Sequence, residues 1–459
     1  MRKRKIFLFV VGLLIIGLLA ACKPEVPAEP VVQEEAAPVE EAAPAEEEAP
    51  AEEPVMEPVT FQVFYPVAVD APIAAILNGY IEDFQAEYPN ITVEPVFSGG
   101  YGDVQTAIQT TIDGGGEPPA LAVMLATALY DLINADYISP LDGYIARMEG
   151  GDAYVDDFMP AFLANSYFDD QLWSIPFQRS AVVMYYNVDM FTAAGLDAPT
   201  SWANLAEAAQ ALTVTEGENT NWGMQYPSGW PYWLFQPLAI GNGQNILNDD
   251  CTVVFDDPAV IEAVQFYIDL SAEYGAMPAG VQAVWPTSST DFASGTTAMI
   301  AHSSGSLSGI IEQAAFEVGV MPLPGKEEGT YASVPGGGNF YIMKGAPQAQ
   351  QDAAWKFVEF ITAPKYVADY SINTGYIANR TSAYDTEAMQ AYVVEVPQAL
   401  DARDAIQYAG AELATQNLGQ VRGIFHDYLQ RAYNGEMSAA EAMAAAQVEA
   451  DAALGDFCH

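Results

Sequence analysis

The segment Trp173–Asn187 reads WSIPFQRSAVVMYYN, and it decides how the chain is divided. Its first part, Trp173–Phe177, is expected to be extended and broken at Pro176, because proline fixes φ and biases the preceding residue away from helix. Ala181–Tyr186 is an apolar, β-branched and aromatic run of strand length. The polar trio Gln178–Ser180 lies between them, and buried polar groups are costly unless they are bonded. The trio therefore predicts a ligand cleft where the chain crosses between two halves, or else a surface turn between two strands.

The N-terminus has the pattern of a secretory signal. The chain has 459 residues and is 51% apolar, enough for two sizeable cores. A basic start is followed by the apolar run Ile6–Ala21, and the ending Leu-Ala-Ala-Cys22 resembles a bacterial lipobox. We predict a lipoprotein signal peptide at 1–21 with Cys22 as the lipidated residue; the alternative is an ordinary signal peptide with a chance cysteine. No second apolar stretch of membrane-spanning length follows, so the mature chain is expected to be tethered by lipid and otherwise soluble.

The next segment predicts a spacer. Residues 22–58 consist almost entirely of Pro, Ala, Val and Glu after the cysteine. Such a sequence has little to bury and repels itself, so we expect an extended, disordered linker. It would hold a globular body outside the cell, anchored to the membrane.

Charge and cysteine content exclude some partners. The formal net charge is −46, with 15 Lys and Arg against 61 Asp and Glu. Nucleic acid binding needs clustered basic residues, so this class of partner is excluded. Apart from Cys22 there are only Cys251 and Cys458, which could form one disulfide or remain two inert thiols.

Hydrophobic periodicity predicts an α/β fold. Apolar residues at helical spacing run from Ile73 to Phe84 and are stopped at Tyr88, and a second helix is expected from Asp103 as its N-cap. Strands are expected at 59–65, 91–96 and 120–125. The order β-α-β-α-β is typical of a parallel sheet flanked by helices.

Further elements follow the central segment. Helices are predicted after Ser201, after Asp257, near Gln350, over 421–432 and after the capping box that begins at Ser438. Strands are predicted at 297–301, 317–321 and 340–343. No internal repeat is present.

A family resemblance emerges from pieces that follow one another in a fixed order. These pieces are Tyr88–Val93, Gly116–Pro119, Pro176–Phe177, Tyr185–Asn187, Ala194–Leu196, Pro199–Trp202, Phe292–Met299, Gly336–Gly338 and Ala354–Val358. In this order they resemble the extracellular solute-binding proteins (family 1) that deliver sugars to ABC importers. The resemblance implies a two-lobed, maltose-binding-protein-like α/β fold with three crossings that closes on a ligand. It places the first lobe at 59–176 and 337–376, and the second at 177–336 and 377–459.

Within that family, several pieces resemble the glycerol-3-phosphate-binding branch. The resemblance implies ligand contacts at four positions, which are Tyr101, Ser304, Gly337 and Tyr376. Two positions depart from the branch: Ala126 stands where it has a ligand-binding glutamate, and a position near Ala414 where it has a phosphate-binding arginine. A phosphate dianion needs an arginine fork or a helix N-terminus, so a phosphorylated ligand is in doubt. Arg179 could supply the missing charge, or could form a structural ion pair.

An aromatic cluster favours a sugar. Six aromatic residues crowd into Trp222–Phe235, and pyranose rings offer apolar faces to such plates. Trp230 and Trp233, bracketed by turn formers, are the best candidates, whereas the others could be core. Polar partners could come from the amide side chains of Gln178, Asn187, Gln236, Asn242 and Asn339.

The sequence contains none of the common catalytic motifs that we considered. There are three histidines, Leu307 rather than serine occupies the centre of Gly305–Gly309, and no metalloprotease or phosphate-loop motif is present. We predict a non-enzymatic, monomeric, cofactor-free receptor that passes a sugar or oligosaccharide to an ABC permease. The alternative ligand is glycerol-3-phosphate or a related phosphodiester, and a sensory lipoprotein with the same fold is the alternative role.

Overall fold

The computed structural model describes residues 57–69, 71–250 and 252–454. The predicted signal peptide, the predicted lipidation site Cys22 and the predicted spacer up to residue 56 lie outside these residues. So do Cys251 and Cys458, and the predictions for all of these segments stay predictions. Within the described ranges, no helix has both the length and the apolar character needed to cross a bilayer.

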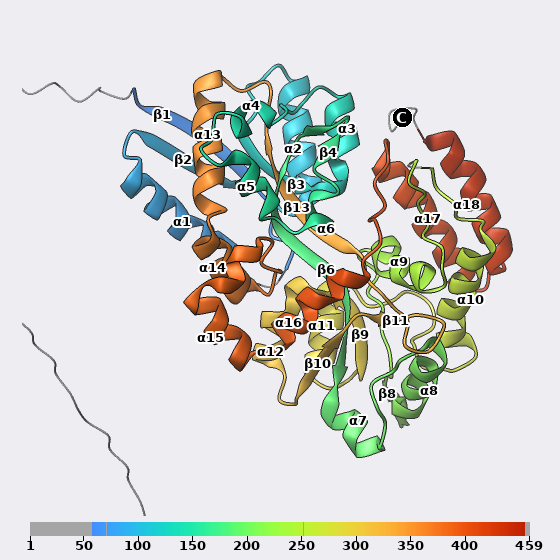
Figure 1. Ribbon diagram of the computed structural model, residues 1–459. Coiled ribbons are helices and arrows are strands. Elements are labelled where there is room, and N and C mark those ends of the chain that lie inside the picture. The colour runs from blue at the N-terminus through green and yellow to red at the C-terminus, as the bar shows by residue number, and fades with distance from the viewer. Residues whose placement is uncertain (1–56, 70, 251, 455–459) are drawn as a thin grey trace, which may run out of the picture. The chain divides into compact units, whose positions relative to one another are not determined.

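Seven strands form the main sheet (Figure 1). They are β1 (Val59–Tyr65), β2 (Ile91–Phe97), β3 (Leu121–Leu125), β6 (Ile175–Asn187), β9 (Met299–Ser303), β10 (Val318–Met321) and β13 (Pro335–Ile342). Their order is β10-β6-β13-β3-β1-β2, and β9 also pairs with β6. The predicted parallel pairing of β1 with its neighbours β2 and β3 is confirmed, whereas β13 runs antiparallel to both β3 and β6.

Strand β6 crosses the molecule as one continuous, buried strand. It pairs with β13 as far as Ala181, and from Val182 onward it pairs with β9. The predicted break at Pro176 is wrong, because this proline lies inside β6 next to a register shift in β13, the kind of irregularity that accommodates a strand proline. The alternative of a surface turn at Gln178–Ser180 is wrong as well, because the trio is buried within the strand.

Helices cover the first sheet region on both faces. The long ones are α1 (Ile73–Glu87), α2 (Tyr101–Asp113), α13 (Gln348–Ile361) and α14 (Pro364–Thr374). Short elements fill the connections: η1 (Ala126–Ala128), α3 (Leu129–Asn134), α4 (Asp142–Ile145), α5 (Gly151–Asp156), α6 (Pro160–Leu163), β4 (Tyr167–Phe168) and β5 (Gln171–Leu172). The predicted N-cap at Asp103 is wrong. The N-cap of α2 is Gly100. Asp103 lies inside the first turn, and its carboxylate accepts a hydrogen bond from the N–H of Gly100 at 2.7 Å.

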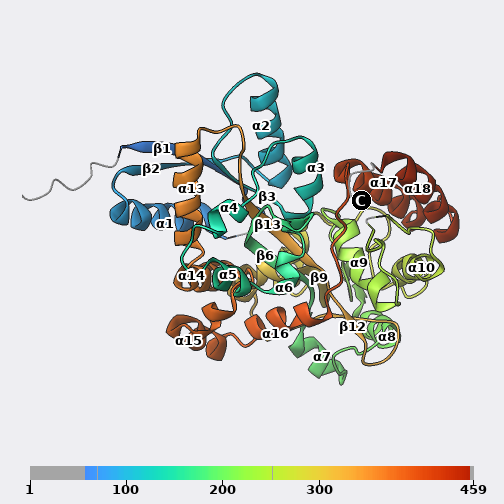
Figure 2. The same ribbon diagram turned by 45° about the horizontal axis from the view of Figure 1, so that its top comes forward.

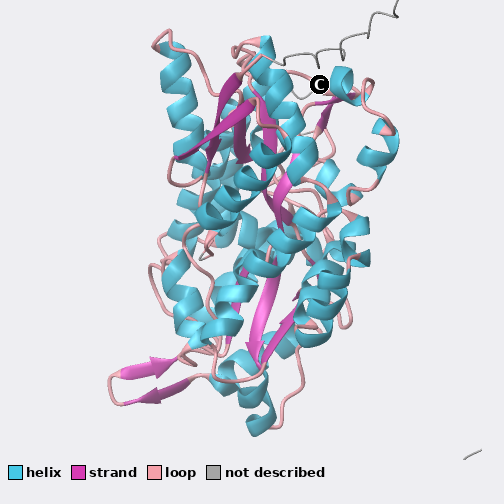
Figure 3. Ribbon diagram, turned by 90° about the vertical axis from the view of Figure 1, so that its left-hand side faces the viewer, coloured by secondary structure: helices cyan, strands magenta, loops and turns pink. Residues whose placement is uncertain are grey.

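Most of the remaining elements lie around the far half of β6 (Figure 3), whereas the two within residues 381–395 pack against α14. The helices among these elements are α7 (Val188–Ala194), α8 (Trp202–Leu212), α9 (Pro231–Gly241), α10 (Pro258–Ala272), α11 (Trp285–Ala293), η2 (Ser304–Ser306), α12 (Leu307–Gln313), η3 (Thr381–Asp385), α15 (Glu387–Glu395), α16 (Gln398–Asp404), η4 (Ala405–Tyr408), α17 (Leu418–Tyr433) and α18 (Ala439–Ala453). Two small hairpins add β7 (Val214–Glu216) with β8 (Asn219–Asn221), and β11 (Leu323–Pro324) with β12 (Tyr331–Ala332). Figures 1 and 2 both place α17 and α18 beside α9 and α10. The predicted capping box at Ser438 is confirmed. The helix predicted after Ser201 begins at Trp202, with Ser201 as its N-cap.

Two large cores flank the crossing strands. One draws on residues 61–177 and 340–376, and the other on residues 182–334 and 413–453. We call the elements around them the first lobe and the second lobe. The predicted lobe boundary falls at 176/177, whereas β6 changes its pairing partner between 181 and 182. The exact domain limits therefore stay a prediction.

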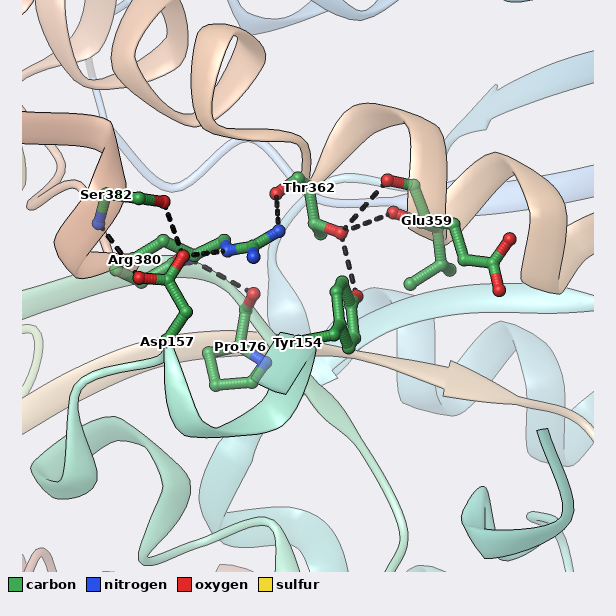
Figure 4. Close-up of polar contacts among 9 residues, drawn as sticks. Tyr154, Asp157, Pro176, Glu359, Thr362, Arg380 and Ser382 are labelled. Atoms are coloured by element: carbon green, nitrogen blue, oxygen red, sulfur yellow. Dashed lines mark hydrogen bonds and ion pairs between the residues drawn. The ribbon is translucent and has the colours of Figure 1, made fainter. Parts of the chain in front are cut away.

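A third crossing segment follows Tyr376 and runs along β6. The N–H of Ile377 donates to the carbonyl of Arg179 at 2.9 Å, and the Asn379 side chain donates to the carbonyl of Pro176 at 3.1 Å. Arg380 then anchors the segment, because its guanidinium donates to Asp157 at 2.6 Å and to the carbonyl of Thr362 at 2.9 Å (Figure 4).

Candidate functional site

A cavity lies where β6 and β13 pass between the two lobes. It encloses about 420 Å³ of empty space, open solvent at its mouth included. It is lined by Ala68, Val69, Tyr101, Leu125, Ser180, Trp230, Tyr232, Trp233, Trp285, Ser303, Gly337, Tyr376 and Glu412. Six of these side chains are aromatic, and they come from both lobes.

The three tryptophans hold different positions in the wall. Trp233 is buried, and its indole N–H donates to the carbonyl of Pro335 at 2.9 Å, which fixes the ring against β13. Trp285 is tilted toward it with 6.3 Å between ring centroids, and it also contacts the tilted ring of His302 at a centroid distance of 3.7 Å. Trp230 is half-buried and packs against both cores, so it closes the gap between the lobes. Large rigid rings with one exposed face suit the apolar faces of a sugar.

A glycine run in β13 makes room for these rings. A Cβ on Gly336 would lie 2.4 Å from the Trp233 indole, and one on Gly338 would lie 2.6 Å from the Tyr101 ring. Gly337 has φ +100°, and a Cβ there would lie 1.8 Å from the carbonyl oxygen of Gln178. The backbone of β13 can therefore approach both aromatic side chains only because these positions lack side chains.

Tyrosines supply the polar edge of the cavity. The hydroxyl of Tyr101 donates to Gln178 Oε1 at 3.1 Å, and Gln178 in turn donates to the hydroxyl of Tyr370 at 2.9 Å. Burial raises the pKa of Tyr101 well above its ordinary value and raises the pKa of Tyr376 to about 12. Both phenols are therefore neutral hydrogen-bonding groups at physiological pH.

The structure brings together most of the residues predicted to bind ligand. Tyr101, Trp230, Trp233, Gly337 and Tyr376 line the cavity. Gln178, Arg179 and Ser304 are fully buried and are not among its lining residues. Contact of any of the eight with a ligand stays a prediction.

Arg179 lies on the opposite face of β6 from Gln178 and Ser180. Its Nη1 donates to Asn339 Oδ1 at 3.1 Å, and its guanidinium lies 5.2 Å from the centroid of the Phe162 ring. Among the described residues, its Nε and Nη2 atoms have no hydrogen-bond partner. Burial lowers the pKa of Arg179, with the carboxyl of Glu412 acting in the opposite direction.

Ser304 and most of the expected amide donors are engaged inside the protein. Ser304 Oγ accepts from the N–H of Ala181 at 3.0 Å, and it is the neighbouring Ser303 that faces the cavity. Asn187 caps α7, and Asn242 bonds Glu262 on the surface. Gln236 supports the 411–413 segment. None of these four residues lines the cavity.

Sequence reasoning missed Trp285, Tyr232 as a lining residue, and Glu412. Trp285 stands alone at the start of α11, outside the aromatic cluster that drew attention. Glu412 is one of 61 acidic residues and carries no motif. Ser180, in contrast, could have been predicted from the sequence. Side chains alternate along a strand, so residues 178 and 180 share one face and Arg179 lies on the other. The position near Ala414, considered for the missing arginine, is buried and lies two residues from Glu412.

The histidines are not placed for acid–base chemistry. Burial lowers the pKa of both His302 and His426 to about 3. His302 Nε2 lies 3.4 Å from the carbonyl of Trp285, and His426 Nε2 accepts from the N–H of Tyr232 at 3.1 Å. Throughout the described ranges, no group of three His, Cys, Asp or Glu side chains is arranged to hold a metal ion.

Comparison with known proteins places the fold and the family. The sn-glycerol-3-phosphate-binding periplasmic protein UgpB of Pectobacterium atrosepticum is 25% identical over 417 residues, covering 83% of this chain and 88% of that protein. UgpB from Mycobacterium tuberculosis in complex with glycerophosphocholine has a TM-score of 0.75 at 22% identity, covering 86% of this chain and 98% of that one. Maltose-bound MalE3 of T. maritima also has a TM-score of 0.75, at 20% identity, and covers 86% and 100%. These likenesses confirm the predicted fold class.

The family assignment rests on a separate comparison. A family model described as bacterial extracellular solute-binding protein matches residues 79–396, which is more than half of the chain. The chain belongs to the bacterial extracellular solute-binding proteins.

Proposed function

We propose that the protein captures a neutral sugar or oligosaccharide in the aromatic cavity and presents it to the permease of an ABC importer. The observation that carries this proposal is the wall of six aromatic side chains, contributed by both lobes around a tyrosine-edged floor. Such walls bury the C–H faces of a sugar ring, and the polar edge meets its hydroxyls. Closure of the lobes on the ligand would be favoured only by the ligand's greater affinity for the closed form.

Two wider spaces adjoin the cavity and favour a ligand of more than one ring. One shares Ala68, Val69 and Trp285 with it and measures about 910 Å³, open solvent included. The other shares Glu412 and measures about 990 Å³ on the same basis. Their walls carry uncharged polar side chains, such as Ser289 and Gln313 in the first and Asn245 in the second. Uncharged hydrogen-bonding groups of this kind suit further sugar units.

A phosphorylated ligand is the alternative, and the names of the relatives favour it. The lining residues argue against it, because none of the described residues that line the cavity is a lysine or an arginine. Arg422 lies behind this wall, 5.3 Å from the centroid of the Trp230 ring, and is not a lining residue. Phosphate recognition relies on charge-assisted hydrogen bonds from such side chains or on a helix N-terminus. We therefore place glycerol-3-phosphate second.

The cellular setting belongs to the same proposal. Cys22 would carry the lipid, residues 22–58 would hold the monomeric body away from the membrane, and the permease would be the partner. A sensory role without a permease would use the same cavity. Growth on the captured sugar, lost when the neighbouring permease genes are deleted, would distinguish transport from sensing.

Binding of sugars is tested by isothermal titration calorimetry and thermal shift on the purified protein. The panel contains maltose, maltotriose, mannotriose, tagatose, glycerol-3-phosphate and glycerophosphocholine. A ligand that binds only the native state raises the melting temperature. We expect a neutral sugar to bind and to raise it. Binding of a phosphate ester with no response to any sugar would overturn the proposal in favour of the alternative ligand.

A further inference from the structure

Glu412 is a buried residue that lines the cavity, and one of its two carboxyl oxygens has no hydrogen-bond partner among the described residues. It lies in the segment between η4 and α17, is 3% exposed and lines both the aromatic cavity and the adjoining space. Among the described residues, no donor lies within hydrogen-bonding distance of its Oε2 atom. Burying a carboxyl oxygen without a hydrogen bond costs free energy. This indicates that a ligand donates the missing hydrogen bond.

The backbone on each side of Glu412 is fixed by one side chain. Gln236 donates from Nε2 to the carbonyl of Ala411 at 3.1 Å and accepts at Oε1 from the N–H of Leu413 at 3.1 Å. Asn245 donates to the same carbonyl of Ala411 at 2.8 Å. The carboxyl is therefore held toward the cavity by contacts that do not involve it, as expected for a preorganised ligand-binding group.

Two arginines lie near the Glu412 carboxyl without forming an ion pair with it. Arg179 on β6 and Arg422 on α17 both act to lower the pKa of Glu412, but burial has the larger effect and raises it to about 8. Neither arginine forms an ion pair with Glu412 within the described chain. Burial raises the pKa of Tyr232 on α9 and of Tyr341 on β13, and the negative charge of Glu412 raises both further.

We propose that Glu412 determines the ligand specificity of this cavity: its ionised form accepts hydrogen bonds from neighbouring hydroxyl groups of a neutral sugar and disfavours phosphate esters. The proposal rests on the proposed function. Hydroxyl groups can donate to both carboxylate oxygens, and hydrogen bonds to a charged acceptor are the strong ones. A phosphate ester offers mostly acceptors, so it could pair only with the protonated carboxyl. Once the carboxyl is ionised, the two negative charges would lie side by side in a poorly solvated site, where repulsion is strong.

The proposal has a consequence for protons. A carboxyl that accepts two hydroxyl donors must be ionised, so sugar binding releases the proton that the empty cavity holds at neutral pH. Affinity for the sugar should therefore rise between pH 6 and pH 8 and level off above. A ligand that presents an acceptor would have the opposite pH dependence, because it would favour the protonated carboxyl.

Other groups at the cavity keep their charge through this range. The pKa of Tyr376 is raised to about 12, and burial raises the pKa of Tyr101 well above its ordinary value. His302 and His426, which pack behind the aromatic wall, have a pKa of about 3 and stay neutral. Proton release between pH 6 and pH 8 would therefore report on Glu412.

The test is calorimetric titration with whichever of maltose, maltotriose, mannotriose and tagatose binds most tightly. Each titration is repeated at pH 7 in phosphate and Tris buffers, whose different ionisation enthalpies reveal proton release. We expect the wild-type protein to release a proton, and Glu412→Gln to bind the sugar roughly 10- to 100-fold more weakly without releasing one. Glu207→Gln is the matched control, because Glu207 is exposed on α8, and it should behave as the wild type.

The outcomes separate the two proposals. A sugar that binds wild-type protein without proton release, and binds Glu412→Gln equally well, would overturn the role of Glu412 and leave the proposed function standing. Tighter binding of glycerol-3-phosphate than of every sugar to wild-type protein would overturn both. If Glu412→Gln does not fold, the buffer dependence of the wild-type protein decides alone, since it requires no substitution.

Discussion

Two polar clusters, one partly buried and one fully buried, flank the crossing strands, and they differ in how completely their groups are paired. Around Arg380, the guanidinium bonds Asp157 and the carbonyl of Thr362, and the Thr362 hydroxyl lies 2.8 Å from that of Tyr154 (Figure 4). Around Glu412, the carboxyl has an unpaired oxygen, and Arg179 on the neighbouring strand has two unpaired nitrogens among the described residues.

The difference separates a structural cluster from a candidate binding site. The Arg380 cluster satisfies its donors and acceptors internally, so it holds the third crossing segment to the first lobe. The Glu412 cluster carries the cost of buried groups that nothing in the described chain satisfies. Local cost of this kind is characteristic of functional sites, which a bound ligand completes.

Breaking the paired cluster should have the largest effect. Arg380→Ala would leave the partly buried Asp157 without its cation and remove the guanidinium from the Tyr154 and Phe158 rings, whose centroids lie 4.9 and 5.3 Å from it. We expect the free energy of unfolding to fall by about 3–4 kcal/mol in urea denaturation.

The exposed ion pair Lys344–Asp136 provides the control for this substitution. Its side chains are 52% and 74% exposed, so Lys344→Ala should cost less than about 0.5 kcal/mol. Equal effects of Arg380→Ala and Lys344→Ala would contradict the structural role of the Arg380 cluster.

Removing the charge from the unpaired cluster should stabilise the empty protein. The pKa of Glu412 is raised from 4.5 to about 8 in the folded state. Because folding favours its protonated form, this contribution to stability is complete below about pH 4.5 and is lost as the pH rises toward 8. Glu412→Gln should therefore be more stable than wild type by roughly 2–3 kcal/mol at pH 8.5, with no difference at pH 4. Denaturation at both pH values tests this, and a destabilised variant at pH 8.5 would contradict it.

The Arg380 cluster predicts the reverse pH dependence. Burial alone would raise the pKa of Asp157, but hydrogen bonds from Ser382 and Arg380 lower it below its ordinary value. Its contribution to stability is thus present at neutral pH and is lost as the pH falls through the folded pKa. The two clusters therefore lose their stabilising contributions in opposite directions of pH.

Much of the first lobe could be predicted from the sequence because local signals agree there. The strand at 59–65 and the helix from Ile73 have the alternation and spacing that their burial requires. Strand β6 could not be predicted as continuous, because Pro176 and the polar trio look like a turn. What sustains the strand is distant in sequence: the register shift of β13 beside Pro176, and the pairing of Gly336–Gly338 opposite the trio.

The residues of the candidate site also fall into those that the sequence predicts and those that it does not. Clustered aromatics at turn formers indicated Trp230 and Trp233, and the family resemblance indicated Tyr101, Gly337 and Tyr376. Glu412 could not be found in this way, because its role depends on burial and on the supporting contacts of Gln236, which only the folded chain reveals. A single acidic residue among many carries no signal in sequence.

Substitution in the aromatic wall tests whether the unpaired site binds a sugar. Trp230 is half-buried, so Trp230→Ala should remove ring contact with modest loss of stability, whereas Trp233 is part of the second core. We expect Trp230→Ala to weaken sugar binding by roughly 1–3 kcal/mol. Calorimetry measures the affinity and thermal unfolding checks the fold. Unchanged affinity in both Trp230→Ala and Trp233→Ala would remove the aromatic wall from the binding site.

The smallest expected effect concerns a contact between the lobes near Glu412. Asp131 on α3 of the first lobe accepts from the N–H of Asn417 at 2.7 Å, at the start of α17 in the second lobe. The N-cap residue Asn417 makes no capping hydrogen bond with its own side chain, so the carboxylate of Asp131 serves that helix end and its dipole.

Because this contact joins the two lobes, it should favour the closed arrangement in which the cavity is formed. Asp131→Asn keeps an acceptor but removes the charge, so we expect sugar affinity to fall by about 0.5–1 kcal/mol with little change in unfolding. Asp136→Asn is the matched control, since Asp136 is exposed and lies beyond the end of α3. A loss of stability without a loss of affinity in Asp131→Asn would show that the contact supports α17 rather than lobe closure. In that case the ligand alone, without help from the Asp131 contact, would bring the lobes together around the unpaired oxygen of Glu412.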